Sequence, residues 1–204
     1  MVLAANGKEI ATVAIRPSGI FGPGDMQGTW QMYMSAKKGM HKVLLGNNTT
    51  LFDFTHVDNI AYSHLLAAKK VDIASPVSGQ VPPLSPLIPT TYRQVFNITN
   101  DEPIFMWDFM KQLYEKLDAR PSFVYSIPFS VAFPLAYLVD AIVALLKPIK
   151  EIHPTFTVFR MKFLSTNRYF CINKAKTLLG YSPIINLEQG IEQTVQWLNT
   201  IDKK

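Results

Sequence analysis

The stretch from Ile10 to Asp25 constrains the fold more strongly than any other part of the sequence, because an apolar run leads there into a loop of glycine and proline. The run contains several β-branched residues and ends at Arg16-Pro17. A near-continuous apolar run of this kind is typical of a strand buried on both faces, as in parallel α/β sheets. In open α/β sheets the ligand lies beyond the carboxyl ends of the strands. The loop that follows Pro17 is therefore the first candidate for a binding site.

The composition is that of a globular protein. Of the 204 residues, 48% are hydrophobic and 17% are charged, which predicts a folded chain with a substantial core. Its one cysteine, Cys171, excludes an internal disulfide and favours a reducing compartment. The net charge of +5 is spread over scattered lysines without an arginine-rich block, so the sequence predicts no nucleic-acid partner.

After the glycine-rich loop, helices and strands are expected in alternation. Gly46-Asn47-Asn48 has the composition of a hairpin turn. Residues 72–91 contain five prolines and predict a surface loop. Apolar periodicity and capping residues predict helices over residues 29–38, 59–69 and 105–117. Strands are predicted over residues 51–57 and 95–99, and the first of these would have one buried face.

Both ends of the chain carry helix signals. Residues 1–7 have the composition of a final helical turn ending at Gly7, and a chain that starts inside a helix leads us to expect an N-terminal truncation. At the other end, Asn173 is expected to cap a helix that stops at Gly180, and Asn186 approximates a capping box for a last helix. The apolar face expected for that helix consists of Leu187, Ile191, Val195 and Leu198.

The most hydrophobic segment, Ile127–Leu146, has about the length of a membrane-spanning helix. Pro128, Pro134 and the charge of Asp140 argue against spanning. A helix that lines an apolar pocket or lies in a membrane interface is favoured, with a plain core helix and a spanning helix left open as alternatives. The lysines beyond it would suit anionic lipid headgroups and equally well solvent.

Two short motifs imitate dehydrogenase signatures. Residues 22–28 nearly spell the dinucleotide fingerprint, but the spacing is one residue too long and Pro23 lacks a backbone N–H, which favours an ordinary turn. Tyr33 and Lys37 have the Tyr-x-x-x-Lys spacing with which short-chain dehydrogenases activate a tyrosine. The pair follows the Arg-Pro strand end, whereas it precedes that strand in those enzymes, so a chance match is favoured.

The residues alone predict no metal site and no complete catalytic set. The four histidines and the cysteine lack metal-ligand spacing. His56-x-Asp58 could hold a metal, but a strand end that runs into a helix cap explains the pair more simply. A nucleophile elbow and a phosphate-binding loop with lysine are also missing from the sequence.

Four separated stretches resemble the extended short-chain dehydrogenases, in particular the 3β-hydroxysteroid dehydrogenase family. They are residues 16–25 (RPSGIFGPGD), 46–59 (from GNN to the LFDFTHVDN segment), 96–103 (FNITNDEP) and 178–183 (LLGYSP), and they occur in the order of that family. The resemblance implies an α/β fold: the distal part of an extended short-chain dehydrogenase, with an incomplete Rossmann sheet and a smaller, mostly helical substrate domain.

The resemblance also implies a domain organisation. Residues 1–204 are expected to form one domain unit that is a C-terminal fragment. In it the last strands of the nucleotide-binding sheet would be interleaved with a substrate-binding region at about residues 26–50 and 100–204.

The activity that the resemblance implies is oxidation of a sterol 3β-hydroxyl with NAD or NADP, after which a carboxylate on the neighbouring C4 leaves as carbon dioxide. Phe21, Phe52 and the apolar helix after Ile127 would bound the sterol. The backbone of Pro17, Ser18, Gly19 and Ile20 would contact the nicotinamide carboxamide.

In that family the glycine-rich phosphate loop and the catalytic Tyr-x-x-x-Lys and serine precede the Arg-Pro strand, and they are not in this sequence. No catalytic residue is therefore assigned, and the chain alone is expected to bind no cofactor usefully and to turn over no sterol. The resemblance implies a sterol and a membrane surface as partners, on the cytosolic face of the endoplasmic reticulum or on lipid droplets, and leaves a homodimer open. The alternative is a non-catalytic sterol-binding or scaffold module.

Overall fold

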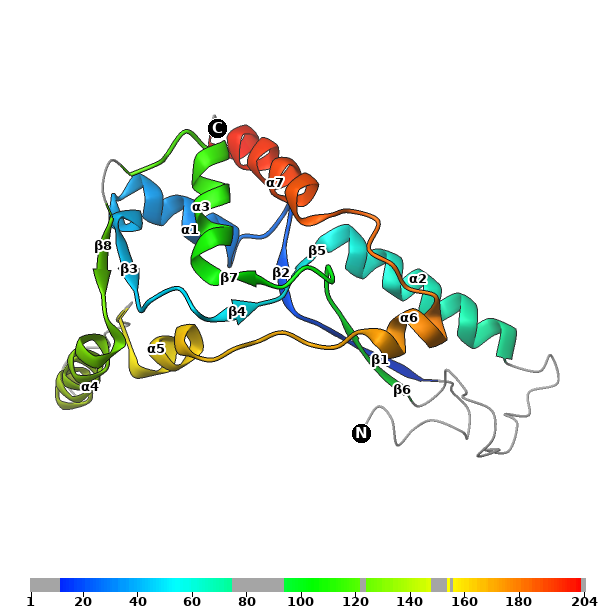
Figure 1. Cartoon of the computed structure of the whole chain (residues 1–204), viewed down its shortest axis with the longest axis horizontal. Helices are drawn as coiled ribbons and strands as arrows, with labels where there is room; N and C mark the ends of the chain where they lie inside the picture. Colours follow the sequence, from blue (N-terminus) through cyan, green and yellow to red (C-terminus); the bar gives the residue numbers. More distant parts are fainter. Residues whose placement is uncertain (1–11, 75–93, 122–123, 148–153, 155, 203–204) are drawn as a thin grey trace. The chain divides into compact units, whose positions relative to one another are not determined.

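The structure is a computed structural model of the chain, and it describes residues 12–74, 94–121, 124–147, 154 and 156–202. The described chain mixes strands and helices (Figure 1) and divides into two compact units. The first unit comprises the described residues within Met1–Asp25, Asp53–Pro103 and Tyr169–Lys204, and the second those within Met26–Phe52 and Ile104–Arg168. Each unit is thus assembled from segments that are far apart in the sequence.

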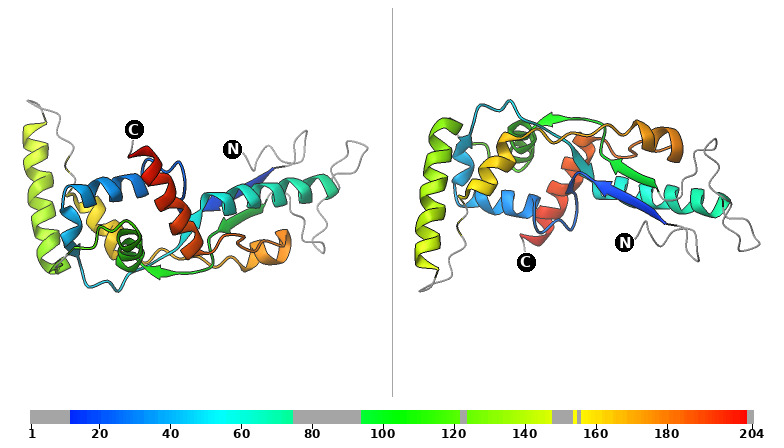
Figure 2. Two further views of the ribbon diagram at one scale, coloured as in Figure 1. Left: turned by 90° about the horizontal axis from the view of Figure 1, so that it is seen from above. Right: turned by 90° about the horizontal axis from the view of Figure 1, so that it is seen from below.

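Two pairs of parallel strands form the β structure of the first unit. β1 (Val13–Pro17) pairs with β6 (Gln94–Ile98), and β2 (Gly19–Phe21) pairs with β5 (Phe54–His56). Parallel strands require a long crossover connection, and α2 (Val57–Ala74) follows β5 and lies alongside β1 (Figure 2). The parallel pairing and its helices confirm the predicted α/β class.

The apolar run that opens the sequence is less buried than predicted. Val13, Ala14 and Ile15 are only partly buried and Arg16 is exposed, so the expectation of a strand buried on both faces is wrong. Within the described residues β1 is hydrogen-bonded to β6 alone. The start of the predicted strand at residues 10–11 and the helix end at Gly7 lie outside the described residues.

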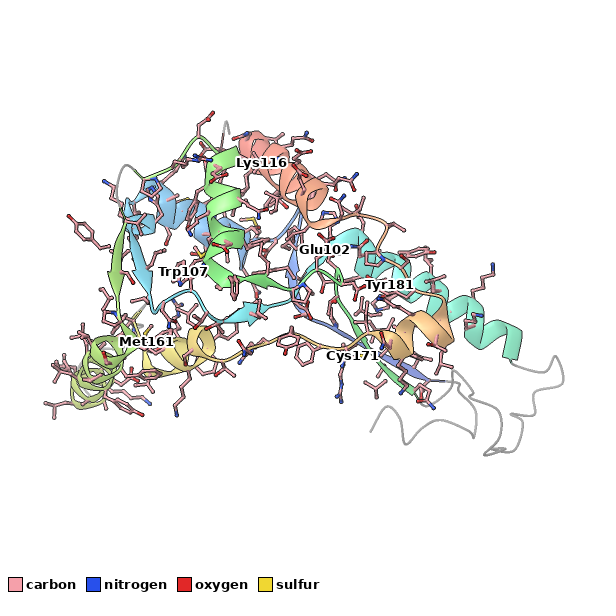
Figure 3. All side chains as sticks on the ribbon, viewed as in Figure 1. Glu102, Trp107, Lys116, Met161, Cys171 and Tyr181 are labelled. Carbon is pink, nitrogen blue, oxygen red and sulfur yellow. The ribbon has the colours of Figure 1, made fainter. Side chains whose placement is uncertain are left out.

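The C-terminal segment builds the core of the first unit. α6 (Asn173–Leu179) packs against β6 and α2. Figure 3 marks Tyr181, which follows α6 and joins this core. The buried members, each at most 2% exposed except Ala67 at 6%, are Ala67, Phe96, Ile98, Ile172, Ala175, Leu179 and Tyr181. The described residues of 169–202 therefore group with β1, β2, β5 and β6, and the predicted substrate-binding region at about residues 26–50 and 100–204 stays a prediction.

α7 (Leu187–Ile201) confirms the helix predicted for the tail. The Asn186 side chain accepts a hydrogen bond from the Gln189 N–H at 2.9 Å, and the Gln189 side chain accepts one from the Asn186 N–H at 3.3 Å, which completes a capping box. The predicted apolar face of this helix is buried. Asn173 does not cap α6, because it is the first helical residue and Ile172 holds the cap position without a side-chain bond.

The second unit is mostly helical. β3 (Val43–Leu45) pairs in parallel with β8 (Tyr125–Ile127), and β4 (Leu51–Phe52) pairs antiparallel with β7 (Ile104–Phe105). A single turn of 3₁₀-helix at Met40–Lys42 precedes β3. The α-helices of this unit are α1 (Thr29–Lys37), α3 (Met106–Lys116), α4 (Phe129–Leu146) and α5 (Val158–Ser165).

Three local predictions are wrong. Gly46-Asn47-Asn48 forms no hairpin, because β3 and β4 pair with β8 and β7 and not with each other. The strand predicted over 51–57 is two strands separated by Asp53, and residues 52–56 are all buried instead of alternating. The loop predicted over 72–91 starts later, since α2 continues to Ala74; residues 75–91 lie outside the described residues.

Candidate functional site

Ser18 holds the loop that the sequence singles out. Its backbone N–H donates to the carbonyl oxygen of Ile98 at 3.1 Å, and its hydroxyl donates to the carbonyl oxygen of Asp53 at 2.8 Å. Ile98 ends β6 and Asp53 immediately precedes β5, so one serine ties the end of β1 to both of these strands. The carboxyl end of β1 therefore has a defined position within the first unit.

Of the four residues predicted to contact the cofactor, the two that begin β2, Gly19 and Ile20, are the exposed ones. Gly19 is exposed and Ile20 is 50% exposed, whereas Pro17 and Ser18 are partly buried. Both donors of Ser18 are already bonded within the unit. Contact between a cofactor and any of the four predicted residues stays a prediction.

Phe21 lies in a tight aromatic cluster behind the loop. It is 1% exposed, and its ring centroid is 5.4 Å from that of His56 and 6.2 Å from that of Phe54, both in edge-on geometry. Gly190 of α7 closes the cluster, because a Cβ atom there would lie 2.8 Å from Phe21 Cζ and 2.9 Å from His56 Cδ2. The structure thus places Phe21, the last residue of β2, in the core, and its predicted contact with a sterol stays a prediction.

His56 is a buried, neutral member of the same cluster. Its Nδ1 accepts a hydrogen bond from the Asp58 N–H at 3.3 Å, and its Nε2 has no hydrogen-bond partner among the described residues. Burial lowers the pKa of His56, and the nearby Asp58 carboxylate, with an oxygen 3.7 Å from Nδ1, opposes that shift only in part. The predicted strand end is confirmed, since β5 ends at His56, but the predicted helix cap is wrong, because α2 begins at Val57 and Asp58 is its second residue.

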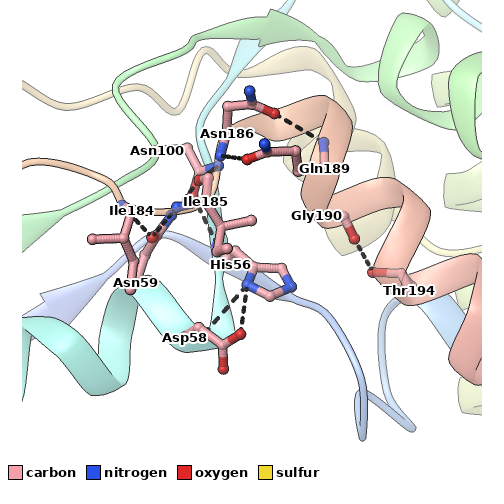
Figure 4. Close-up of polar contacts among 10 residues, drawn as sticks. All are labelled: His56, Asp58, Asn59, Asn100, Ile184, Ile185, Asn186, Gln189, Gly190 and Thr194. Atoms are coloured by element: carbon pink, nitrogen blue, oxygen red, sulfur yellow. Dashed lines mark hydrogen bonds and ion pairs between the residues drawn. The ribbon is translucent and has the colours of Figure 1, made fainter.

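A pair of asparagines fixes the geometry around His56 (Figure 4). Asn100 accepts the His56 backbone N–H at 2.9 Å and an amide hydrogen of Asn59 at 2.7 Å. Asn59 in turn accepts the N–H groups of Ile184 and Ile185 at 2.9 and 3.0 Å, and both asparagine amides donate to the Ile185 carbonyl. Both asparagines are at most 2% exposed. The sequence analysis missed this network, although Asn directly after a strand and in the first turn of a helix was a visible signal.

Asp53 is another buried ionisable group of the first unit. One carboxylate oxygen accepts the Phe170 N–H at 2.6 Å, and the other has no partner among the described residues. Burial raises the pKa of Asp53, the Phe170 hydrogen bond opposes this, and the charge of Asp101 adds to the increase. Asp53, whose backbone carbonyl accepts the Ser18 hydroxyl, therefore carries a carboxyl group that is costly to ionise.

Phe52, the second predicted sterol contact, belongs to the second unit. It is 4% exposed and its ring lies 5.5 Å from that of Phe163, over which the Arg168 guanidinium is placed at 4.2 Å. The structure describes it as part of a packed cluster, and its contact with a substrate stays a prediction.

The Gly46-Asn47-Asn48 segment anchors the start of α3 instead of forming a hairpin. Asn48 accepts the Trp107 backbone N–H at 3.1 Å and donates to Asp108 at 2.9 Å, while the Trp107 indole donates to the Leu45 carbonyl at 2.9 Å. These bonds satisfy an N–H group that a helix start leaves unpaired. The segment therefore positions α3 next to β3.

α4 exposes most of its apolar surface within the second unit. Ala132 and Ala136 are fully buried against Met161 of α5, and Asp140 accepts the N–H of Val158 at the start of α5 at 3.1 Å. Among the described residues, α4 is the one helix that is long and apolar enough to cross a membrane, and 11% of it is buried. The exposed apolar side chains, each 47–78% exposed, are Val131, Leu135, Tyr137, Leu138, Ile142 and Leu145.

The motif that imitates a catalytic pair has a different geometry. The Lys37 ammonium lies 5.0 Å from the centre of the Tyr33 ring, in a cation–π contact, and Tyr33 is 7% exposed. In the part of the chain that the structure describes, no group of three or more histidine, cysteine, aspartate or glutamate side chains could hold a metal ion.

The fold is that of the extended short-chain dehydrogenases, as solved structures show. The structure of gox2253 superposes with a TM-score of 0.62 at 20% identity, over 93% of this chain and 49% of that one. UDP-glucose 4-epimerase from Thermotoga maritima, determined with UDP-glucose, gives 0.58 at 17% identity over 94% and 47%. dTDP-glucose 4,6-dehydratase from Bacillus anthracis, determined with NAD, gives 0.54 at 16% identity over 94% and 45%.

Sequence comparison gives the family. Residues 1–129 match the model of the 3-beta hydroxysteroid dehydrogenase/isomerase family, and the chain belongs to that family. It is 39% identical over 202 residues to sterol-4-alpha-carboxylate 3-dehydrogenase, decarboxylating, of Schizosaccharomyces pombe, over 99% of this chain and 54% of that protein. The mouse protein of the same name is 36% identical over 99% of this chain and 52% of its own length. The chain spans about half the length of these relatives.

Proposed function

We propose that this chain supplies the nicotinamide-side loop and the substrate region of an oxidoreductase of sterol biosynthesis. The substrate is a 4α-carboxysterol, whose 3β-hydroxyl is oxidised with NAD or NADP and whose carboxyl group is released. The observation that carries the proposal is the 36–39% identity, over nearly the whole chain, to relatives named for this reaction.

The reaction is an oxidation followed by loss of carbon dioxide. A nicotinamide, held by the residues named below, would supply the hydride acceptor for the hydrogen on C3, and the C3 hydroxyl group would lose its proton. The resulting 3-ketone lies β to the carboxylate on C4. When the bond from C4 to the carboxylate breaks, its electron pair passes into the enolate of that ketone, and C4 then takes up a proton.

In this proposal the residues at the end of β1 and the start of β2 would lie against one side of a nicotinamide ring. Gly19 and Ile20 are accessible there, and Gly19 presents only backbone. The backbone N–H and the hydroxyl of Ser18 donate to the carbonyl oxygens of Ile98 and Asp53. In this proposal Ser18 therefore positions the loop and does not bind the ring. Gly19 and Ile20 would hold the nicotinamide, and an apolar Ile20 would exclude water from its face.

We also propose that the chain does not catalyse the reaction by itself. The family's glycine-rich phosphate loop and its Tyr-x-x-x-Lys pair have no counterpart ahead of Arg16-Pro17 in the 204 residues. Tyr33 and Lys37 do not replace that pair, since the Lys37 ammonium is engaged with the ring face. The catalytic proton transfer would therefore come from a segment that this chain does not contain.

A pair of measurements tests the proposal. Calorimetry of the 204-residue chain with NADH and NADPH should show no binding at micromolar concentrations. A chimera joins the part of the Schizosaccharomyces pombe enzyme that precedes the region matched by this chain to the 204-residue chain. This chimera should form NADH or NADPH and carbon dioxide in equal amounts from a 4α-carboxysterol. Within the chimera, Ile20→Asp should lower kcat/KM at least tenfold, and Leu65→Asp, an exposed change on α2, should not.

The outcomes separate the two candidate functions. Micromolar NADH binding by the chain alone contradicts the proposed dependence on a further segment, and a folded but inactive chimera contradicts the enzymatic role. Sterol binding by the chain alone together with an inactive chimera would favour the non-catalytic sterol-binding module.

We further propose that α4 lies in a membrane interface, on the cytosolic face of the endoplasmic reticulum or on a lipid droplet. The Asp140 carboxylate is bonded to the start of α5, so this charge does not oppose insertion of the opposite face. That face carries Val131, Leu135, Leu138, Ile142 and Leu145 at helical spacing. Full burial of one such side chain from water contributes about 1.5–3 kcal/mol, and these side chains, 47–78% exposed, would each gain about half of that or more, which together is enough for peripheral binding.

Flotation with vesicles tests the membrane proposal. The chain should float with phosphatidylcholine vesicles that contain phosphatidylserine, and Leu138→Asp combined with Leu145→Asp should leave it at the bottom of the gradient. Leu65→Asp is the matched control, because Leu65 is 69% exposed on α2. Equal flotation of the control and the α4 variant would contradict the proposal.

A further inference from the structure

Asp53 is bonded to two segments of the first unit through two different groups. Its backbone carbonyl oxygen accepts the Ser18 hydroxyl at 2.8 Å, and its carboxylate accepts the Phe170 N–H at 2.6 Å. Ser18 lies between β1 and β2, whereas Phe170 lies 117 residues beyond Asp53 and precedes α6. All three residues belong to the first unit. One residue therefore ties the segment that follows β1 to the segment that leads into α6.

The carboxyl group of Asp53 makes its contact against a desolvation penalty. Asp53 is 2% exposed, and burial raises its pKa because a buried carboxylate loses its hydration. The hydrogen bond from the Phe170 N–H opposes that increase. An apolar side chain at position 53 would avoid the penalty, but it could not accept this N–H. The specific service of the carboxyl group is therefore to hold the backbone of Phe170.

The segment that Asp53 holds presents large side chains to the outside. Tyr169 is 53% exposed and Phe170 is 48% exposed, although the Phe170 backbone is fixed by its hydrogen bond. Ile20, two residues after Ser18, is 50% exposed. An aromatic ring on a fixed backbone loses little conformational freedom when a flat apolar molecule packs against it.

The proposed reaction, on which this inference rests, relates the two segments to the two bound molecules. Hydride transfer requires that C3 of the sterol lie in contact with the nicotinamide ring. In that proposal Gly19 and Ile20 hold the nicotinamide, so the sterol occupies the adjoining space. The Tyr169–Phe170 segment is tied to the Ser18 segment through Asp53, and its exposed rings match the apolar skeleton of a sterol.

We propose that Asp53 is a positioning residue for the sterol: its carboxyl group holds the Tyr169–Phe170 segment, and the Phe170 ring contacts the sterol skeleton. The buried Asp53 side chain does not touch the substrate itself. Its backbone carbonyl serves the cofactor side, and every substitution at position 53 retains that group. Changes of the side chain are therefore expected to weaken the binding of the sterol and not that of the cofactor.

Amide hydrogen exchange of the 204-residue chain, followed by NMR, tests the contact. In Asp53→Ala the Phe170 N–H should exchange about tenfold faster, as expected for the loss of one hydrogen bond. Asp53→Asn retains a side-chain oxygen that accepts the N–H and should restore slow exchange. Because Phe170 is half exposed, water can take the freed N–H, so Asp53→Ala should fold, which urea unfolding checks. Equal exchange rates in the three proteins would overturn the proposal.

Kinetics of the chimera test the role in the reaction. Asp53→Ala should raise KM for the 4α-carboxysterol about tenfold and leave KM for NAD or NADP within about twofold, and Asp53→Asn should restore the sterol KM. Phe170→Ala should raise the sterol KM to a similar extent. Combining it with Asp53→Ala should give no further increase, because both changes remove one contact. Asp101→Asn is the matched control, since the exposed Asp101 carboxylate pairs with Lys176 and both KM values should stay unchanged.

The outcomes separate this proposal from the proposed function. An inactive but folded chimera overturns both. An active chimera overturns the role of Asp53 alone if Asp53→Ala changes both KM values alike or neither of them. Additive effects of Asp53→Ala and Phe170→Ala on the sterol KM would also overturn it, because Asp53 would then not act through Phe170.

Discussion

Replacing Gly46 by alanine should destabilise the second unit more than the same replacement at Gly39. Both glycines have left-handed backbone angles, with φ values of 81° and 71°, so alanine incurs a similar backbone cost at each, about 1–2 kcal/mol. The surroundings differ. A Cβ atom at Gly46 would lie 2.2 Å from Phe129 Cε2, whereas nothing lies within 4 Å of a Cβ atom at Gly39.

The collision at Gly46 cannot be relieved by moving the backbone cheaply. The Gly46 N–H donates to the Ile127 carbonyl at 2.8 Å, and the Gly46 carbonyl accepts from the Ser126 hydroxyl at 2.8 Å. Phe129 must therefore move, and its ring is packed against Phe133 at 5.9 Å. Overpacking of this kind adds about 1–3 kcal/mol. The expected loss of stability is then about 2–5 kcal/mol for Gly46→Ala, against about 1–2 kcal/mol for Gly39→Ala.

Urea unfolding at 25 °C, followed by tryptophan fluorescence, measures this difference. A Trp197→Phe background leaves Trp30 and Trp107, which both lie in the second unit, as the reporters. When Phe129 is replaced by alanine, Gly46→Ala should cost no more than Gly39→Ala does. Equal losses for the two glycine variants, within about 0.5 kcal/mol, or an excess that persists without the Phe129 ring, would refute the steric explanation.

Three further changes test the first unit. Tyr181→Phe should lower the free energy of unfolding by about 1 kcal/mol in urea titrations, because it removes the hydrogen bond to the Thr99 carbonyl; no loss would show that this bond is not stabilising. Burial lowers the pKa of His56 in the folded chain below its ordinary 6.5, so the unfolded chain binds the extra proton and stability should fall as the pH drops below about 6.5. His56→Phe should flatten that pH profile, and an unchanged slope would exclude His56 as its cause. In an unhindered helix Gly190→Ala would be stabilising by about 1 kcal/mol. Here the new Cβ atom would lie 2.8 Å from the Phe21 ring, so the variant should be less stable. A gain in thermal unfolding temperature would contradict this packing.

The helices could be predicted because their signals are local. The predicted range 29–38 corresponds to α1, 105–117 to α3 and 187–198 to α7, each within a few residues. Apolar spacing and capping residues lie within one or two turns of the element that they define. The capping box of Asn186 and Gln189 formed as expected for the same reason.

The strand pairings could not be predicted, because each partner lies far along the chain. β3 meets β8 about 80 residues later, and β4 meets β7 about 50 residues later, so the turn-like residues between β3 and β4 gave a misleading local signal. Asp53 misled in another way. A charged residue between two phenylalanines predicts a strand with one exposed face, yet this carboxyl group is 2% exposed and bonded to the backbone of Phe170, 117 residues away.

At the candidate site, as for the strands, the local composition was visible in the sequence but the distant contacts were not. Glycine and proline after β1 predicted a loop at the end of a strand, but residues 19–21 form β2, and the residues that fix this segment lie elsewhere in the sequence. Ser18 bonds to Ile98 and Asp53, and the asparagine network that orders the neighbouring end of β5 closes on Ile185. All of these partners belong to the first unit, so the segments of that unit are sufficient to define the path of the loop. In the proposed function, a segment that is fixed in this way would meet the nicotinamide with its conformation already set, which would reduce the entropy that binding must overcome.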